Sequence, residues 1–107
     1  MITKHQYVRS KKLLKLVADL PCQHCGYHHN VQAAHSNWGG GKGRGIKASD
    51  NLVAALCFMF HFEIDQGSKL SKEERQTRWV TAHKSTVTTL LGQGIWPVDI
   101  PIPEITE

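Results

Sequence analysis

Five residues in the middle of the sequence have types and spacing suited to metal-assisted hydrolysis: His35, the pair Asp50-Asn51, His61 and Asp65. His61 and Asp65 are four residues apart in a stretch predicted to be helical, so both side chains share one face and can hold a divalent cation. His35 ends a predicted strand and Asp50-Asn51 opens the next, so strand pairing would bring them together. An imidazole, whose pKa is normally about 6.5, is a competent base at neutral pH. A single histidine in such a position is usually an ordinary structural residue. The five residues together predict a metal-dependent hydrolytic site.

The three cysteines are a second candidate for metal binding. Cys22 and Cys25 have zinc-knuckle spacing, and Cys57 adds a third thiol. A structural zinc site needs four ligands, and Phe60 stands where a second Cys-x-x-Cys would end. A structural Zn²⁺ and three small buried thiols without metal are therefore alternative interpretations. Three histidines near the knuckle are candidate fourth ligands: His24, His28 and His29.

A glycine-rich loop contributes positive charge close to the histidines. The segment 39–45 contains five glycines with Lys42 and Arg44, and Lys47 follows. It matches neither a Walker A loop nor a dinucleotide fingerprint. A flexible hairpin loop is the plain alternative, but three cations beside a histidine cluster favour contact with phosphate.

Charge is distributed unevenly along the 107 residues. Residues 1–47 hold eight basic side chains and one acidic, a net +7, whereas residues 48–107 hold five basic and eight acidic, a net −3. A basic half suits a polyanion such as nucleic acid, although a solvated lysine-rich surface would look the same. The basic residues expected to contact a phosphate backbone include three on the first predicted helix: Lys11, Lys12 and Lys15.

The elements that must position these residues can be predicted from hydrophobic spacing and turn residues. We expect helices over 10–20 and 58–66, strands over 31–35 and 50–56 paired as an antiparallel hairpin, and a longer helix ending near Gly92. Ser71 and Glu74 form a capping box that opens the last helix. One domain is expected, with an arm over 1–9, a core over 10–94 and a proline-containing, extended tail over 95–107.

No apolar run approaches the roughly 20 residues of a membrane span, and the N-terminus lacks the apolar core of a signal peptide. We therefore expect a cytoplasmic protein without membrane contact.

The order of these motifs resembles the HNH endonucleases, also called ββα-metal or His-Me finger nucleases. The matching stretches are Ala34-His35, Asp50-Asn51-Leu52, Leu56-Cys57 through His61, and Asp65, preceded by the Cys22–Cys25 turn. The lysine helix, the Gly-Lys-rich loop and the Asp-Asn pair look most like small phage and prophage members, the YbcO-like and Ref-like nucleases. The resemblance covers roughly residues 10–66. It implies an α+β fold, a small ββα-metal core of a hairpin plus a short helix, flanked by an N-terminal and a longer C-terminal helix.

The resemblance also implies a function and residue roles. The protein would be a metal-dependent endonuclease that hydrolyses DNA in recombination, repair or processing inside a bacterial host, alone, as a homodimer or with phage recombination proteins. His35 would be the general base, and Asn51 would orient His35 or brace the hairpin. His61, with Asp65 and Asp50 as further ligands, would bind Mg²⁺ or Mn²⁺.

Two residues depart from the family pattern. Ala34 stands where many HNH enzymes have a metal-binding Asp or His, and Phe60 interrupts the zinc motif. These departures favour an alternative, a catalytically inactive HNH-like module that binds nucleic acid. A metal-stabilised interaction domain with no nucleic-acid role is the third hypothesis.

Overall fold

The computed structural model describes residues 9–28, 30–35, 49–65 and 69–103, with Asp65 described by its backbone alone. The elements in chain order are α1 (Lys11–Ala18), β1 (Val31–His35), β2 (Val53–Cys57), α2 (Phe58–Asp65) and α3 (Lys72–Gly92). The expected α+β fold is confirmed: an antiparallel hairpin runs directly into a short helix, an arrangement consistent with ββα, and two further helices flank it.

The hairpin pairs β1 with β2 in a register that runs from Val31 opposite Cys57 to His35 opposite Val53. The predicted first strand is confirmed, but the second begins at Val53 rather than Asp50. Asp50 and Asn51 form a turn instead, and their side chains bond to the Ser10 amide, to His35 and to the Pro101 carbonyl. Short polar side chains of this kind compete with ladder bonds and favour turns.

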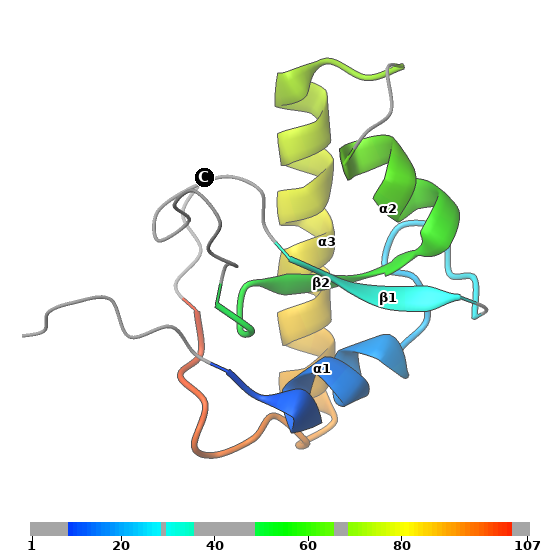
Figure 1. Cartoon of the computed structure of the whole chain (residues 1–107). Coiled ribbons are helices and arrows are strands. Elements are labelled where there is room, and N and C mark those ends of the chain that lie inside the picture. The colour runs from blue at the N-terminus through cyan, green and yellow to red at the C-terminus, as the bar shows by residue number, and fades with distance from the viewer. Residues whose placement is uncertain (1–8, 29, 36–48, 66–68, 104–107) are drawn as a thin grey trace, which may run out of the picture.

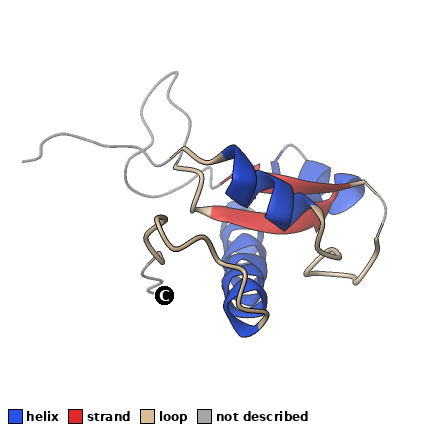
Figure 2. Cartoon of the chain, turned by 90° about the horizontal axis from the view of Figure 1, so that it is seen from below, coloured by secondary structure: helices blue, strands red, loops and turns tan. Residues whose placement is uncertain are grey.

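The three helices enclose the hairpin from different directions. Figure 1 shows α1 against one face of the hairpin, α2 against the other, and α3 passing behind β2. In the view turned by 90° in Figure 2, α1 lies over the strands and α3 is seen nearly along its axis beside them. One end of α3 therefore lies near α2 and the other end near α1.

Two clusters of buried side chains follow from this arrangement, because successive residues of a strand point to opposite faces. One cluster joins β2 to α2 and the first half of α3, and contains Ala54, Leu56, Ile64 and Trp79 among others. The second joins the opposite face of β2 to α1 and the end of α3. Its buried members are Leu13, Val17, Leu20, Val53, Ala55 and Leu90. Within the described residues, no helix is both long and apolar enough to cross a membrane.

α3 also satisfies the outer edge of β2, which no third strand covers in the described part of the chain. The Ala55 amide donates to Oγ1 of Thr86 at 3.0 Å, and Nδ1 of His83 donates to the Val53 carbonyl at 2.8 Å. The Ala55 carbonyl accepts from the Gln23 amide at 2.8 Å. The outer edge of β2 is thus closed by side chains of α3 and by a backbone amide of the turn after α1, not by another strand.

The helix ends agree with their capping residues. The capping box between Ser71 and Glu74 is present at the start of α3, as predicted. Bonds to the Ser71 backbone amide and hydroxyl lower the pKa of Glu74. α1 is shorter than the expected 10–20, because Ser10 caps it by accepting a bond from the Leu13 amide and Asp19 ends it.

The C-terminal segment was expected to be extended, but its beginning forms a turn. The Ile100 amide bonds back to the Pro97 carbonyl at 3.2 Å, and Nε1 of Trp96 donates to the Ile100 carbonyl at 2.9 Å. Proline restricts the backbone here and Trp96 supplies the bond that closes the turn. Trp96 and Ile100 pack against the second cluster, so this segment lies on the domain.

Candidate functional site

His35 and Asp50 form a close pair at the end of the hairpin, where β1 ends and the turn before β2 lies. Nε2 of His35 lies 2.8 Å from Oδ1 of Asp50. The Asp50 carboxylate is buried, whereas a quarter of the His35 side chain is exposed (25%). An ionised carboxylate can only accept, so Nε2 carries the proton and Nδ1 of the neutral ring keeps its lone pair. The pair therefore presents a solvent-accessible imidazole in a defined tautomer.

The second oxygen of Asp50 is held by the beginning of α1. The Ser10 amide donates to Oδ2 of Asp50 at 2.7 Å, while the Ser10 hydroxyl caps the helix. A buried carboxylate needs such partners, because an unpaired buried charge is costly. Two exposed lysines, Lys11 and Lys12, follow Ser10 directly. Their positive charges are therefore adjacent in sequence to the Ser10 amide that binds Asp50.

Asn51, expected to orient His35 or brace the hairpin, has a different partner. Its Nδ2 donates to the Pro101 carbonyl at 3.0 Å, and the side chain is buried. The described contact thus joins the start of β2 to the C-terminal segment. The residue that orients His35 is Asp50, which the sequence suggested only as a metal ligand.

His61, the expected metal ligand on α2, is bonded to β1. Its Nδ1 lies 2.6 Å from Oε1 of Gln32, an acceptor, so Nδ1 carries the proton and Nε2 keeps a lone pair. Metal-binding histidines are typically held in this way by a bond from their other nitrogen. Gln32 and Ala34 are two apart on β1 and share a face, whereas His35 lies on the opposite face by strand alternation.

The structure therefore does not gather the predicted metal ligands into one set among the described side chains. Asp50 is engaged with Ser10 and His35, and His61 with Gln32. Ala34 is buried in the core, its carbonyl accepts from Nε1 of Trp79 at 2.9 Å, and its methyl side chain offers no ligand atom. The side chain of Asp65 and the predicted phosphate-binding residues of the loop lie outside the described residues: Lys42, Arg44 and Lys47. Lys15 pairs with Asp19 at 3.7 Å on the exposed side of α1.

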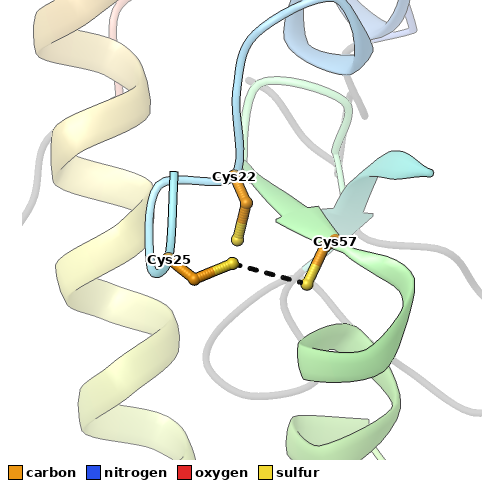
Figure 3. Close-up of side chains that lie close together, drawn as sticks. All are labelled: Cys22, Cys25 and Cys57. Atoms are coloured by element: carbon orange, nitrogen blue, oxygen red, sulfur yellow. Dashed lines mark hydrogen bonds between the residues drawn. The ribbon is translucent and has the colours of Figure 1, made fainter. Parts of the chain in front are cut away.

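The three cysteines converge, as their proposed zinc role requires. Their Sγ atoms all lie within 4.8 Å of one another, and those of Cys25 and Cys57 are 3.9 Å apart. Figure 3 shows the sulfurs of the Cys22–Cys25 turn facing Cys57 at the junction of β2 and α2. Among the described residues, no other group of cysteine, histidine or acidic side chains is gathered this closely. These thiols could bind a metal ion.

Local backbone geometry favours deprotonation of one thiol. Burial raises the pKa of Cys22, but the backbone amides of Cys25, Cys57 and His24 around its sulfur outweigh this effect, so the pKa is lowered. The Tyr27 amide lowers the pKa of Cys25, but desolvation and the neighbouring thiols together raise it. The turn passes through Gly26 at φ +78°, a conformation that favours glycine. A thiol whose deprotonation is favoured by nearby amides, beside two further thiols, suits a soft metal ion, which deprotonates its thiol ligands on binding.

No described histidine takes the place of the zinc ligand that is missing at Phe60. The Phe60 ring stacks on that of His24 with centroids 3.6 Å apart and an interplanar angle of 4°. Burial, with a smaller contribution from Arg78, lowers the pKa of His24. Neither His24 nor the exposed His28 joins the three-thiol group, and His29 lies outside the described residues.

Two functional contacts could not be assigned from the sequence: Gln32 as the partner of His61, and the Ser10 amide as a partner of Asp50. A glutamine next to apolar positions of a predicted strand is a weak signal for the first. No sequence signal identifies a backbone amide forty residues away. Comparisons of this chain with protein-family models, with curated proteins and with solved structures find no match.

Proposed function

We propose that the protein is a nuclease that hydrolyses phosphodiester bonds of DNA, with His35 as general base and Asp50 as the residue that orients it. The observation that carries the proposal is the 2.8 Å contact between Nε2 of His35 and Oδ1 of Asp50 at the end of the hairpin. The resemblance to small phage and prophage HNH nucleases supports DNA as substrate and a bacterial cytoplasm as the setting.

The chemistry follows from the protonation pattern of the pair. Because Nε2 donates to Asp50, Nδ1 of His35 can take a proton from water, and the hydroxide attacks phosphorus while the bond from phosphorus to the 3′ oxygen breaks. The departing 3′ oxygen takes a proton from solvent and the imidazolium returns its proton to solvent, so the products carry 5′-phosphate and 3′-hydroxyl ends. Asp50 stabilises the imidazolium that results, as its negative charge lies next to the ring. Lys11 and Lys12 are exposed beside the N-cap that anchors Asp50, and they would hold the DNA backbone close to the pair.

The Mg²⁺ or Mn²⁺ implied by the resemblance fits one residue well. His61 has the orientation of a metal ligand, with Nδ1 bonded to Gln32 and Nε2 left with its lone pair. Among the described side chains, His61 belongs to no group of three or more potential ligands. The base step therefore depends on His35 and Asp50.

The test is metal-dependent cleavage of DNA. Purified protein is incubated with plasmid and with single-stranded DNA plus Mg²⁺ or Mn²⁺, beside His35→Ala. We expect cleavage by the wild type and its loss in the variant. If both proteins leave every substrate intact, the proposed nuclease activity is ruled out.

A second function, DNA binding without cleavage, is favoured by the burial of Ala34 and by the incomplete cation site. It predicts retention of DNA that weakens steeply with salt, with no products under any metal. If both Lys11 and Lys12 contact phosphate, their double change to Gln would reduce the slope of the logarithm of the DNA-binding constant against the logarithm of salt concentration by about 2. The same change at Lys69 and Lys72, which precede and begin α3 far from α1, is the charge-matched control.

For the cysteine cluster we propose Zn²⁺ as the metal. Thiolates are soft ligands that Zn²⁺ prefers, and a sulfur at about 2.3 Å from zinc is compatible with three Sγ atoms already within 4.8 Å of one another. The ion would tie the turn after α1 to the junction of β2 and α2, a structural role separate from His35.

A further inference from the structure

The thiol cluster opens onto a pocket that two of its three members line. A cavity of about 510 Å³ is lined by Cys25 and Cys57, together with side chains of α2 and of the turn after α1. Cys22, by contrast, is 2% exposed and does not line the pocket. Three apolar side chains of the lining are largely exposed: Tyr27, Phe58 and Met59. A reagent that enters this pocket from solvent therefore meets Cys25 and Cys57.

The same two thiols are positioned to bond to each other. Their Sγ atoms are 3.9 Å apart and are joined by the dashed line in Figure 3. A disulfide needs about 2.05 Å between its sulfurs, so each has to move by roughly 1 Å. Cys25 is exposed, so its side chain can rotate toward Cys57 without displacing the core. The sulfur of Cys22 instead accepts from the His24 amide at 3.4 Å, which holds it in the interior.

We propose that, when no metal occupies the cluster, Cys25 and Cys57 form a reversible disulfide by exchange with a low-molecular-weight disulfide that enters the pocket. The proposal concerns the same thiols as the proposed zinc site, so it deepens that part of the proposed function. It is independent of DNA cleavage.

The exchange takes place in two steps. The Cys25 thiolate attacks one sulfur of the small disulfide, whose S–S bond breaks, and the other half leaves as a thiolate. Cys57 then attacks the Cys25 sulfur of this mixed disulfide, and the second half leaves as the protein disulfide forms. The two protein thiols lose two electrons and two protons, and the small disulfide takes up both to become two thiols. No further oxidant is needed.

The disulfide and a bound Zn²⁺ exclude one another. A sulfur in a disulfide is no longer a thiolate ligand, so oxidation removes two of the three sulfurs that could hold the ion. Conversely, an ion bound by Cys25 and Cys57 occupies the lone pairs that the exchange requires. The cluster would therefore hold zinc when reduced and release it when oxidised. In both states the turn after α1 is tied to the junction of β2 and α2.

The experiment treats the metal-free full chain with oxidised glutathione, alkylates the remaining thiols and digests the product with trypsin. Mass spectrometry should find one cross-link per chain, between the peptide with Cys25 and the peptide with Cys57, and an alkyl label on Cys22. Cys22→Ser should form the cross-link at the wild-type rate, because Cys22 takes no part. Cys57→Ser should instead accumulate the mixed disulfide at Cys25.

Concentrated urea is the control for the role of the fold. In an unfolded chain the shortest loop closes most readily, so the bond should shift to Cys22 and Cys25. One equivalent of Zn²⁺ added to the folded chain before oxidised glutathione should suppress the cross-link.

A native chain that bonds Cys22 to Cys25 and carries the label on Cys57 would overturn the proposal. Labelling of all three thiols after the treatment would overturn it as well. Cross-linking of Cys25 to Cys57 that Zn²⁺ does not slow would support the disulfide and reject the zinc proposed for the cluster, so the two failures are distinguishable.

Discussion

Oδ1 of Asp50 accepts a hydrogen bond from Nε2 of His35 at 2.8 Å, while Oδ2 of the same carboxylate accepts from the Ser10 amide at 2.7 Å. One buried side chain therefore connects the end of β1, the turn before β2 and the N-terminus of α1. The imidazole is held in one tautomer by a residue that is itself held by backbone. This connection joins the stability of the fold to the chemistry proposed for His35.

The closure of the β2 edge by α3 predicts a cost for Thr86→Val. Valine keeps the shape of threonine but leaves the buried Ala55 amide without its acceptor, which should lower the free energy of unfolding by about 1–3 kcal/mol. Urea denaturation measures the change. Thr88→Val, the same substitution at an exposed position of α3, should change stability by about 0.5 kcal/mol or less. Equal effects of the two substitutions would show that the edge bond is not important.

Neighbouring leucines near the end of α3 differ in burial. Leu90 is fully buried between α1 and β2, whereas Leu91 is 43% exposed. Leu90→Ala should reduce the free energy of unfolding by about 2–5 kcal/mol through lost burial and a residual cavity. Leu91→Ala should have a much smaller effect. Thermal or urea unfolding compares them directly, and a reversed order would contradict the packing of α3 on α1.

His83 predicts a loss of stability in mild acid. Burial beside Trp79 lowers the pKa of His83, despite an opposing effect of the Val53 carbonyl, and its buried Nε2 has no hydrogen-bond partner among the described residues. The unfolded chain takes up a proton as the pH falls below about 6.5, whereas the folded chain resists it. Stability should therefore be constant above this pH and decline below it.

His83→Gln tests this origin, because glutamine retains a donor for Val53 but does not titrate. Urea midpoints measured from about pH 8 to about pH 5 should fall less in the variant than in the wild type. His24, whose pKa is also lowered, contributes with the same sign and leaves a residual slope. An unchanged pH dependence in His83→Gln would assign the decline to other groups.

Metal binding by the thiols predicts a zinc-dependent gain in stability. Zn²⁺ at one hundred times its Kd should stabilise the folded state by about 2.7 kcal/mol, which raises Tm by roughly 10 °C or more for a domain of this size. A chelator should reverse the gain. Cys25→Ser should remove most of the zinc response at little cost to the metal-free fold, because Cys25 is exposed. Equal Tm values with zinc and with chelator would exclude a structural zinc.

Much of the fold could be predicted because its signals are local. The strand over 31–35, the apolar run that becomes α2 and the capping box at Ser71 depend on neighbouring residues, and all three occur in the structure. The ladder start at Val53 could not be predicted, since Asp50 and Asn51 bond to Ser10, His35 and Pro101 instead. Those partners come from distant parts of the chain.

The candidate site was predictable in its residue types but not in its partners. His35 and Asp50 do meet, but the contact makes Asp50 an orienting residue rather than a free metal ligand. The bond between His61 and Gln32 depends on how α2 lies across β1, which spacing along one helix cannot indicate. The cysteine cluster was the easier prediction, because two of its members are fixed by one turn.

The most direct test of the proposed function is the rate of DNA cleavage by three single variants compared with the wild type. His35→Ala removes the base and should lower the rate by about 10²–10⁴-fold. Asp50→Asn should also lower it strongly, because an amide no longer selects the tautomer with a lone pair on Nδ1. Asp99→Asn, the same change on an exposed turn, should cleave at the wild-type rate. Cleavage by His35→Ala or Asp50→Asn at the rate of Asp99→Asn would contradict a catalytic His35–Asp50 pair.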